Sequence, residues 1–437
     1  MPPPMDASAS PLPASGAETV PPAPPGRLWN RSFTFLWVGQ TISHLGNPAF
    51  NIGALLWMME KTGSASLMGL LMMASAIPSL LLTPFGGTFA DRHSRVRIML
   101  WGDLAAGLAI LAFAAALWLR PDDTRLIIPL LFAVAVTTGI VRAFFAPAVS
   151  AIVPDLVPQE KLPAANSLTQ LSVQASIFSG QAIGGILYKA FGASLLFAID
   201  GVSFLGAAVC TLLIPRDIRP TRRAATTEAH PFRRFLAETG EGFRYVWGLR
   251  GLRDFLLTVS LLNFLATPGM VLFPFYVERY LNVGPQWYGF LIAGVSVGTV
   301  VGFVLAGAFR LRGAARMRAI LGCLLLYPVF FGSLALWRHP IPALVAVFLG
   351  GITVGYLNVF LISMAQASAT SEMRGRVMAF IGILAGGLMP LGMAVGGFVG
   401  DLTNKNVPLV FAICAGLVLL VVLLLGFRRT CREYLAA

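Results

Sequence analysis

Charged side chains are scarce in this sequence. Only 12% of its 437 residues are Asp, Glu, Lys or Arg, whereas 57% are hydrophobic, and the mean hydropathy is +0.77. Because soluble globular domains carry about 25% charged residues, this composition excludes an ordinary soluble protein. Apolar runs of about 20 residues recur, each long enough to cross a ~30 Å hydrocarbon layer as a helix. Since backbone polar groups in lipid must be satisfied within each segment, the sequence predicts an all-α polytopic membrane protein.

Cysteine is also rare, and no enzyme motif is present. The four cysteines lie in apolar runs or in the basic C-terminal segment, with neither a disulfide framework nor a metal-ligand spacing. Neither a Walker A motif nor a catalytic triad is found. We therefore expect no enzyme activity, no ATP hydrolysis, no metal and no cofactor. Residues 1–27 are rich in Pro, Ala and Ser and lack the apolar core of a signal peptide, which predicts a disordered cytosolic tail.

Twelve membrane-spanning helices are predicted, in two groups of six. The expected spans are 33–58, 67–90, 98–119, 126–148, 164–188, 193–215, 255–277, 287–309, 317–337, 341–364, 376–400 and 407–426. A basic central loop, residues 216–253, separates an N-terminal half (28–215) from a C-terminal half (254–427), and residues 428–437 form a second tail. Hydrophobic residues among the arginines of this loop leave two interpretations open, an amphipathic helix on the inner leaflet and an ordinary basic linker.

The positive charges are distributed unevenly between the loops. Of the 32 Lys and Arg residues, 24 fall on the side that holds both termini, seven on the other side, and one, Arg142, lies within a span. Basic residues accumulate in cytosolic loops. We therefore expect both termini to be cytosolic, in a bacterial cytoplasmic membrane. The same distribution explains the net charge of +13 as a topology signal, without a nucleic-acid partner.

The two halves show weak internal similarity. The segment GTFADR (87–92) after the second span matches GAFRLR (307–312) after the eighth at three positions, and GQAIGGIL (180–187) in the fifth span matches GMAVGGFV (392–399) in the eleventh. The offsets are close to half the chain length, as expected of two repeated six-helix halves.

These features together resemble the major facilitator superfamily. GTFADRHSRVR (87–97) is similar to its motif A, Gly-x-Leu-Ala-Asp-Arg-x-Gly-Arg-Arg. FFAPAVSAIVPDLVPQEKLPAANSL (144–168), FAIDGVSFL (197–205) and EMRGRVMAF (372–380) are similar to the branch that holds the enterobactin exporter and macrolide-efflux proteins. The resemblance covers residues ~28–428. It implies two pseudo-symmetric six-helix halves that transport a small-molecule substrate by alternating access, with one chain sufficient as a monomer.

The resemblance also assigns a role to the charged turn at 87–97. Charges are costly in the bilayer, so this segment must lie in a cytosolic loop. In the family, Asp91 would sit at the N-terminus of the eleventh helix, around 374–377, and accept backbone N–H bonds there. Gly87 would permit close helix approach, and Arg92 or Arg95 would hold the carboxylate in place. The alternative is that the arginines serve topology alone.

Polar side chains form stripes along three of the predicted spans. On one face of the first span we expect four residues to line a central substrate cavity, and we assign the same role to pairs in the fifth and seventh spans. These candidates are Gln40, His44, Asn47 and Asn51, then Gln170 and Gln174, then Asn263 and Thr267. The alternative is that the stripes are interhelical hydrogen bonds with a structural role.

Few ionisable groups lie inside the spans. His44, Asp103, Arg142 and Asp200 are the candidates for proton coupling, and Arg142 could neutralise either carboxylate in a structural ion pair instead. Two departures from the family pattern bear on the coupling ion: Asn47 stands where the branch usually has Asp, and Gln181 stands where the antiporter motif has Pro.

Three functions remain open. The first is a secondary exporter of amphipathic small molecules (drug, macrolide or siderophore class) driven by proton antiport. The second is an importer or a lysolipid or lipid flippase on the same fold, which the two departures favour. The third is a membrane scaffold or sensor, which a complete motif A disfavours.

Overall fold

The computed structural model describes residues 28–215, 240–241, 243–309, 311–368, 382, 384, 386–426 and 428–436. The described part of the chain is almost entirely helical and holds no strand. Its N-terminal half consists of α1 (Arg31–Thr62), α2 (Ala65–Arg92), α3 (Arg95–Leu119), α4 (Thr124–Leu156) and α5 (Leu162–Leu212), with a short 3-10 turn at Gln159–Lys161.

Capping residues set the boundaries of these helices. The Asn30 side chain accepts a hydrogen bond from the Phe33 N–H at 2.9 Å and so caps α1. The Ser64 hydroxyl accepts from the Leu67 N–H at 3.2 Å and caps α2, and the Asp123 carboxylate caps α4 in the same way. Each cap satisfies one of the backbone donors left over at a helix start.

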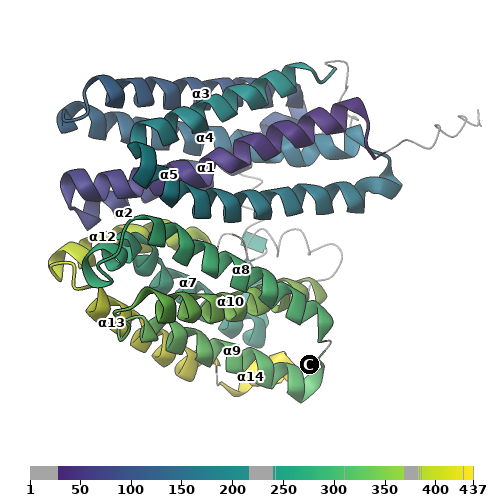
Figure 1. The fold of residues 1–437 in the computed structure, drawn as a ribbon. Helices are drawn as coiled ribbons and strands as arrows, with labels where there is room; N and C mark the ends of the chain where they lie inside the picture. Colours follow the sequence, from purple (N-terminus) through teal and green to yellow (C-terminus); the bar gives the residue numbers. More distant parts are fainter. Residues whose placement is uncertain are drawn as a thin grey trace, which may run out of the picture.

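α5 contains two of the predicted spans. It runs for 51 residues, and Gly192 has non-helical backbone angles (φ 76°, ψ −179°) inside it. Such a positive φ is readily adopted only by glycine. The chain therefore bends at Gly192, between the predicted spans 164–188 and 193–215, and the two parts run back in opposite directions, each packed against α1 (Figure 1).

The C-terminal half has the same helical character. Its elements are α7 (Arg250–Phe275), which continues as a π-helical turn at Tyr276–Tyr280, α8 (Gln286–Ala308), α9 (Gly313–Ser333), α10 (Pro340–Ser368), α12 (Met389–Leu402), α13 (Val407–Val421), a π-helical turn at Val422–Gly426, and α14 (Arg429–Ala436). Among the described residues, nine helices are long and apolar enough to cross a membrane, and α12 is a shorter apolar helix. With α1, whose polar side chains lower its hydropathy, and with α5 counted as two spans, these helices fit the predicted arrangement of twelve.

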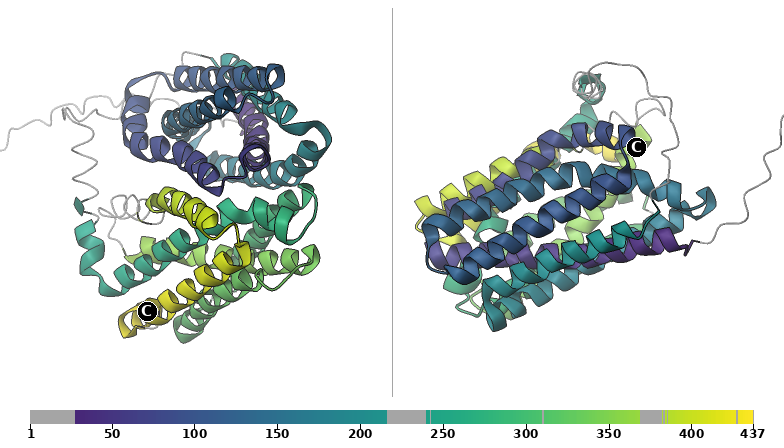
Figure 2. Two further views of the ribbon diagram at one scale, coloured as in Figure 1. Left: turned by 90° about the vertical axis from the view of Figure 1, so that its left-hand side faces the viewer. Right: turned by 90° about the horizontal axis from the view of Figure 1, so that it is seen from above.

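The helices form two bundles that lie one above the other (Figures 1 and 2). α1–α5 make one bundle and α7–α14 the other. The start of α1 and helix α14 lie at the same end of the molecule (Figure 1), which agrees with two termini on one side of a membrane. Below, this end is called the predicted cytosolic end, and the end where α1 finishes and α2 begins is called the predicted outer end.

The segment after the last span is a packed helix, which the sequence did not suggest. α14 lies against α7 and α9, and Cys431 and Leu435 on it are fully buried. The Thr430 hydroxyl donates to Asp254 on α7 at 2.7 Å, and the Arg316 guanidinium donates to the Leu435 carbonyl oxygen at 3.1 Å. The predicted tail 428–437 is therefore part of the C-terminal bundle over its described residues.

Candidate functional site

The two bundles meet at the predicted outer end through α2 and α12. Asp401, near the end of α12, accepts three hydrogen bonds from the first residues of α2: from the Ser64 hydroxyl at 3.0 Å, the Ala65 N–H at 3.0 Å and the Ser66 N–H at 2.9 Å. The unpaired N–H groups and the dipole at a helix start attract an anion. Asp401 is thus the anion at the start of α2, and it joins the two halves.

The same charge is held strongly in its ionised form. Asp401 lies beyond the predicted span 376–400. Burial by itself would raise the pKa of Asp401, but hydrogen bonds from Ser66, Ala65 and Ser64 outweigh it and lower the pKa to about 2. Lys405 adds an ion pair at 3.5 Å. This contact therefore stays charged at physiological pH.

Glycines bring the backbones of the two halves into direct contact beside Asp401. A Cβ on Gly69 of α2 would collide with the Met393 carbonyl oxygen of α12, and a Cβ on Gly397 of α12 would collide with the Ala65 carbonyl oxygen. Small residues permit such close helix packing in membranes. The α2–α12 contact is therefore tight only while every one of these positions lacks a side chain.

A second contact between the halves joins α5 and α8. The Ser296 hydroxyl donates to the Gln181 side-chain oxygen at 2.9 Å, and Gly289 packs directly on the Gln181 carbonyl oxygen. Gln181 is the residue that replaces the proline of the family's antiporter motif. Its side chain thus supplies a polar contact that proline could not make, and both contacts between the halves lie toward the predicted outer end.

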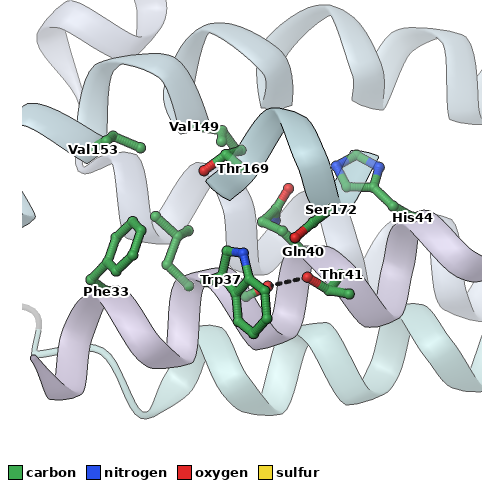
Figure 3. Close-up of a pocket in the computed structure, with 10 residues that line it drawn as sticks. Phe33, Trp37, Gln40, Thr41, His44, Val149, Val153, Thr169 and Ser172 are labelled. Carbon is green, nitrogen blue, oxygen red and sulfur yellow. Dashed lines mark hydrogen bonds between the residues drawn. The ribbon is translucent and has the colours of Figure 1, made fainter. Parts of the chain in front are cut away.

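A pocket lies toward the predicted cytosolic end of the N-terminal half, between α1, α4 and α5 (Figure 3). It is lined by Phe33, Leu36, Trp37, Gln40, Thr41, His44, Val149, Val153, Thr169 and Ser172. Gln40, His44 and Ser172 lie close together in this view, among aromatic and aliphatic neighbours. Its wall is apolar with a few polar groups, as in small-molecule sites, but in this structure it has room for only about one water molecule.

The polar stripe predicted on the first span divides into three environments. Gln40 and His44 line this pocket, as a substrate-cavity role requires. Asn47 is half-buried and its amide donates to the Ser43 carbonyl oxygen at 3.0 Å, within α1 itself. Asn51 is exposed, farther along α1 toward the predicted outer end. The assignment of all four to one cavity remains a prediction, and only the first two lie together in a pocket.

The candidates on the other spans also differ in environment. Gln170 is exposed and Gln174 half-buried on α5, and neither lines this pocket, although the neighbouring Thr169 and Ser172 do. On α7, Asn263 is half-buried, whereas Thr267 is buried against Gly392 of α12. The Thr267 hydroxyl donates to the Asn263 carbonyl oxygen at 2.7 Å. Thr267 therefore packs between helices here, as in the structural alternative, and its expected exposure to a cavity is not seen.

The two buried carboxyls of the spans are not ion-paired with Arg142. Asp103 on α3 is 0% exposed, Asp200 on α5 is 1% exposed, and none of their four carboxylate oxygens has a hydrogen-bond partner among the described residues. Asp200 packs directly against Gly46 of α1, and Asp103 faces Cys210 of α5. The predicted structural pairing of Arg142 with either carboxylate is therefore wrong for this structure. Arg142 instead acts electrostatically on His44.

The motif A segment shows a different set of contacts from those expected. Arg95 forms an ion pair with Asp155 at the end of α4, and its guanidinium donates to the Ala151 carbonyl oxygen at 2.9 Å. Arg95 thus fixes α3 to α4 in this structure and does not hold Asp91. Asp91 and Arg92 are exposed at the end of α2. The expected partner of Asp91, at 374–377, lies outside the described residues.

Close packing beside this motif comes from the neighbouring glycine. No described atom lies within 4 Å of a Cβ built on Gly87, whereas a Cβ on Gly86 would collide with the Ala143 carbonyl oxygen of α4. The close approach of α2 and α4 therefore requires Gly86. The predicted role of Gly87 beside the eleventh helix stays a prediction, because residues 374–377 lie outside the described residues.

Two functional candidates, Asp401 and Asp155, were not predicted from the sequence. Asp401 and Asp155 each follow an apolar run and resemble ordinary loop carboxylates in the sequence. A signal for Asp401 was present in the small residues around it and in Ser64–Ser66, which begin α2. Only the fold brings these segments together, since 335 positions separate Ser66 from Asp401.

Comparison with known proteins gives consistent matches over the whole described chain. A family model for transmembrane secretion effectors matches residues 23–436. Macrolide efflux protein A of Streptococcus pyogenes is 26% identical over 390 residues, which are 86% of this chain and 91% of that protein. Multidrug efflux pump Tap of Mycolicibacterium fortuitum is 26% identical over 365 residues, 80% of this chain and 85% of that protein. A solved structure of a bacterial homologue of the iron transporter ferroportin, in an inward-facing state, superposes with a TM-score of 0.68 at 17% identity and covers 91% of this chain and 99% of that one.

Proposed function

This chain belongs to the transmembrane secretion effector family of the major facilitator superfamily, and we propose that it exports amphipathic small molecules of the drug, macrolide or siderophore class by proton antiport. It is a transporter of the efflux branch and not an enzyme. The names of its relatives, a macrolide efflux protein and a multidrug efflux pump, support the proposed substrate range.

One observation carries the proposal. The two halves touch through Asp401 and the glycines of α2 and α12 at the predicted outer end, while the pocket with Gln40 and His44 lies toward the predicted cytosolic end. An exporter must load its substrate from the cytosol while the other side is shut. We propose that both termini lie on the cytosolic side of a bacterial cytoplasmic membrane. In that orientation the contact between the halves closes the outer side, as loading of an exporter from the cytosol requires.

Release of substrate then requires the opposite arrangement. In our proposal the contact between Asp401 and the start of α2 opens, and the motif A contact of Asp91 with the eleventh helix forms at the cytosolic end. Both contacts use the same pair of helices at opposite ends, and both place a carboxylate at a helix start. The halves would thus rock against one another between two charge-stabilised states, while the pocket moves with the N-terminal half that contains it.

For the coupling proton we propose Asp200 as the carrier. A carboxylate enclosed with at most one hydroxyl beside it, that of Ser203, is costly when it is ionised, so it favours taking up a proton. Asp200 packs against Gly46 of α1, next to Asn47 of the polar stripe, whereas Asp103 is enclosed against another part of α5. Movement of α1 would therefore reach Asp200 first.

Proton flux in energised everted vesicles tests this proposal. A fluorescent pH probe would follow the addition of macrolides, cationic drugs, catecholate siderophores and lysolipids. We expect one class to collapse the gradient with the intact protein, and Asp200→Asn to abolish the flux, while Asp103→Asn, the matched control, retains it. Compound redistribution without proton movement would refute antiport and favour a flippase or uniporter. Unchanged flux in Asp200→Asn would refute the carrier.

A further inference from the structure

Arg142 is a cation within a predicted span, and no counter-charge pairs with it among the described residues. Among the described residues no ion pair or hydrogen bond reaches its guanidinium, and the only charge effect that links it to a neighbour is with His44 of α1. Arg142 lies inside the predicted span 126–148, and 14 residues separate it from the end of α4 at Leu156. Because the predicted span ends at 148, Arg142 lies six residues inside its cytosolic end, about 9 Å along the helix axis.

The position of Arg142 on α4 directs it toward the inside of the N-terminal half. Val149 and Val153, seven and eleven residues later, line the pocket, and residues at this spacing share one helical face. Ile140, on the opposite face, is 39% exposed. Arg142 is itself exposed, so its charge is not enclosed in packed protein.

The carboxyls within the predicted spans do not pair with Arg142. Away from the ends of the spans, its carboxyls are Asp103 and Asp200, and both are enclosed by other helices and make no contact with Arg142. Asp254, at the cytosolic end of α7, is already paired with Arg253 and Thr430. The family's usual acidic residue in the first helix is Asn47 in this chain.

We infer that Arg142 binds an anionic group of the substrate, so that the transported amphiphile carries a carboxylate or a comparable acid. An intramembrane cation without a partner is costly, and a substrate anion supplies the missing charge with charge-assisted hydrogen bonds. Arg142 does not itself line the pocket, but Val149 and Val153 on the same face of α4 do, together with the polar Gln40, His44 and Ser172. This inference rests on the proposed transport function and narrows its substrate range to acids.

Binding of a matched pair of probes tests the inference separately from transport. The purified full-length protein in a non-ionic detergent is titrated with 11-(dansylamino)undecanoic acid and with its methyl ester, which differ only in the acid. We expect the acid to bind at least about tenfold more tightly than the ester, and Arg142→Gln to remove this preference, since a hydrogen bond to a charged group is worth about one to two powers of ten.

Three further variants separate charge recognition from a structural effect. Arg125→Gln, on the same helix at its exposed outer start, should leave the preference intact. Arg142→Lys should retain part of it. His44→Glu should suppress acid binding while ester binding persists, because it places a carboxylate next to Arg142. Equal affinities for acid and ester, or an equal loss of both in Arg142→Gln, would overturn the inference.

A transport assay with the same protein distinguishes failure of the anion site from failure of the proposed transport function. If no compound is moved in vesicles but acid binding depends on Arg142, the proposed function fails and the anion site stands. If neutral or cationic amphiphiles are exported and the acid probe neither binds nor competes with them, the export function stands and the anion site is refuted.

Discussion

Replacement of Asp401 by Asn should loosen the contact between the halves at the predicted outer end. The carboxylate accepts from the Ser64 hydroxyl and from the N–H groups of Ala65 and Ser66, and its side chain is 28% exposed. The Asn side-chain amide keeps one acceptor oxygen but loses the negative charge, and its NH₂ group faces the backbone N–H donors of α2. Hydrogen bonds to charged groups contribute about 1.5–3 kcal/mol, and an anion at a helix start contributes about 0.3–2 kcal/mol.

Because solvent screens part of this charge, we take the lower end of the range. A loss of about 1.5–2 kcal/mol corresponds to about 10- to 30-fold more opening of this contact. Hydrogen exchange followed by mass spectrometry measures it directly, since the amide hydrogens of Ala65 and Ser66 are the ones bonded to Asp401. We expect exchange over residues 64–70 to accelerate by that factor.

Asp123→Asn is the matched control for this experiment. Asp123 caps α4 at the same end of the molecule but within one half, through the Leu126 N–H. Because Asn caps a helix about as well as Asp, this variant should change exchange at the start of α4 little and leave residues 64–70 unchanged. Protection of residues 64–70 within about twofold of the original in Asp401→Asn, or equal loss in both variants, would refute the reasoning about Asp401.

The same contact should be insensitive to pH over the physiological range. The pKa of Asp401 in the fold, about 2, lies below its ordinary value of about 3.9. A group with a depressed pKa stabilises the structure fully above its ordinary value, and this stabilisation is lost only as the pH falls through the lower one. Exchange at residues 64–70, corrected for intrinsic rates, should therefore be constant between pH 5 and pH 8.

Three further substitutions test the other contacts. Asp91→Asn should abolish transport while the protein still inserts, because the motif A contact needs the charge; full transport activity would contradict that role. Gly69→Ala should prevent the two halves from closing at the predicted outer end, because its Cβ meets a backbone carbonyl oxygen, and should reduce transport at least about tenfold. The control Gly322→Ala, whose Cβ has no described atom within 4 Å, should transport normally. Asp155→Asn should destabilise the α3–α4 contact by about 1–3 kcal/mol, because it removes the ion pair of the half-buried Arg95. The loss should appear as a lowered melting temperature, and an unchanged melting temperature would exclude this contribution.

The helices and their order were predictable because their signals are local. Each span needs only its own apolar run and its own caps, so the predicted span 98–119 and the observed α3, Arg95–Leu119, differ only at their start. The bend inside α5 was implied by the polar break before Gly192. α14 was not predicted, since its burial depends on contacts with α7 and α9 that its own short polar sequence does not reveal.

The candidate site was predictable only in part, for the same reason. The spacing of Gln40 and His44 places them on one helical face, and that geometry is fixed by the helix itself. Whether Asn47 faces a cavity or bonds within α1 depends on neighbouring helices, as does the burial of Thr267.

By itself, the sequence determined the membrane setting, the two repeated halves and the family, because hydropathy, charge position and motifs are written in consecutive residues. Tertiary structure alone decided which charges are paired. It joined Asp401 to the start of α2, paired Asp155 with Arg95, and gave Arg142 no carboxylate partner among the described residues. Electrostatic pairing falls off within a few ångströms, and only the folded chain brings residues hundreds of positions apart to that distance.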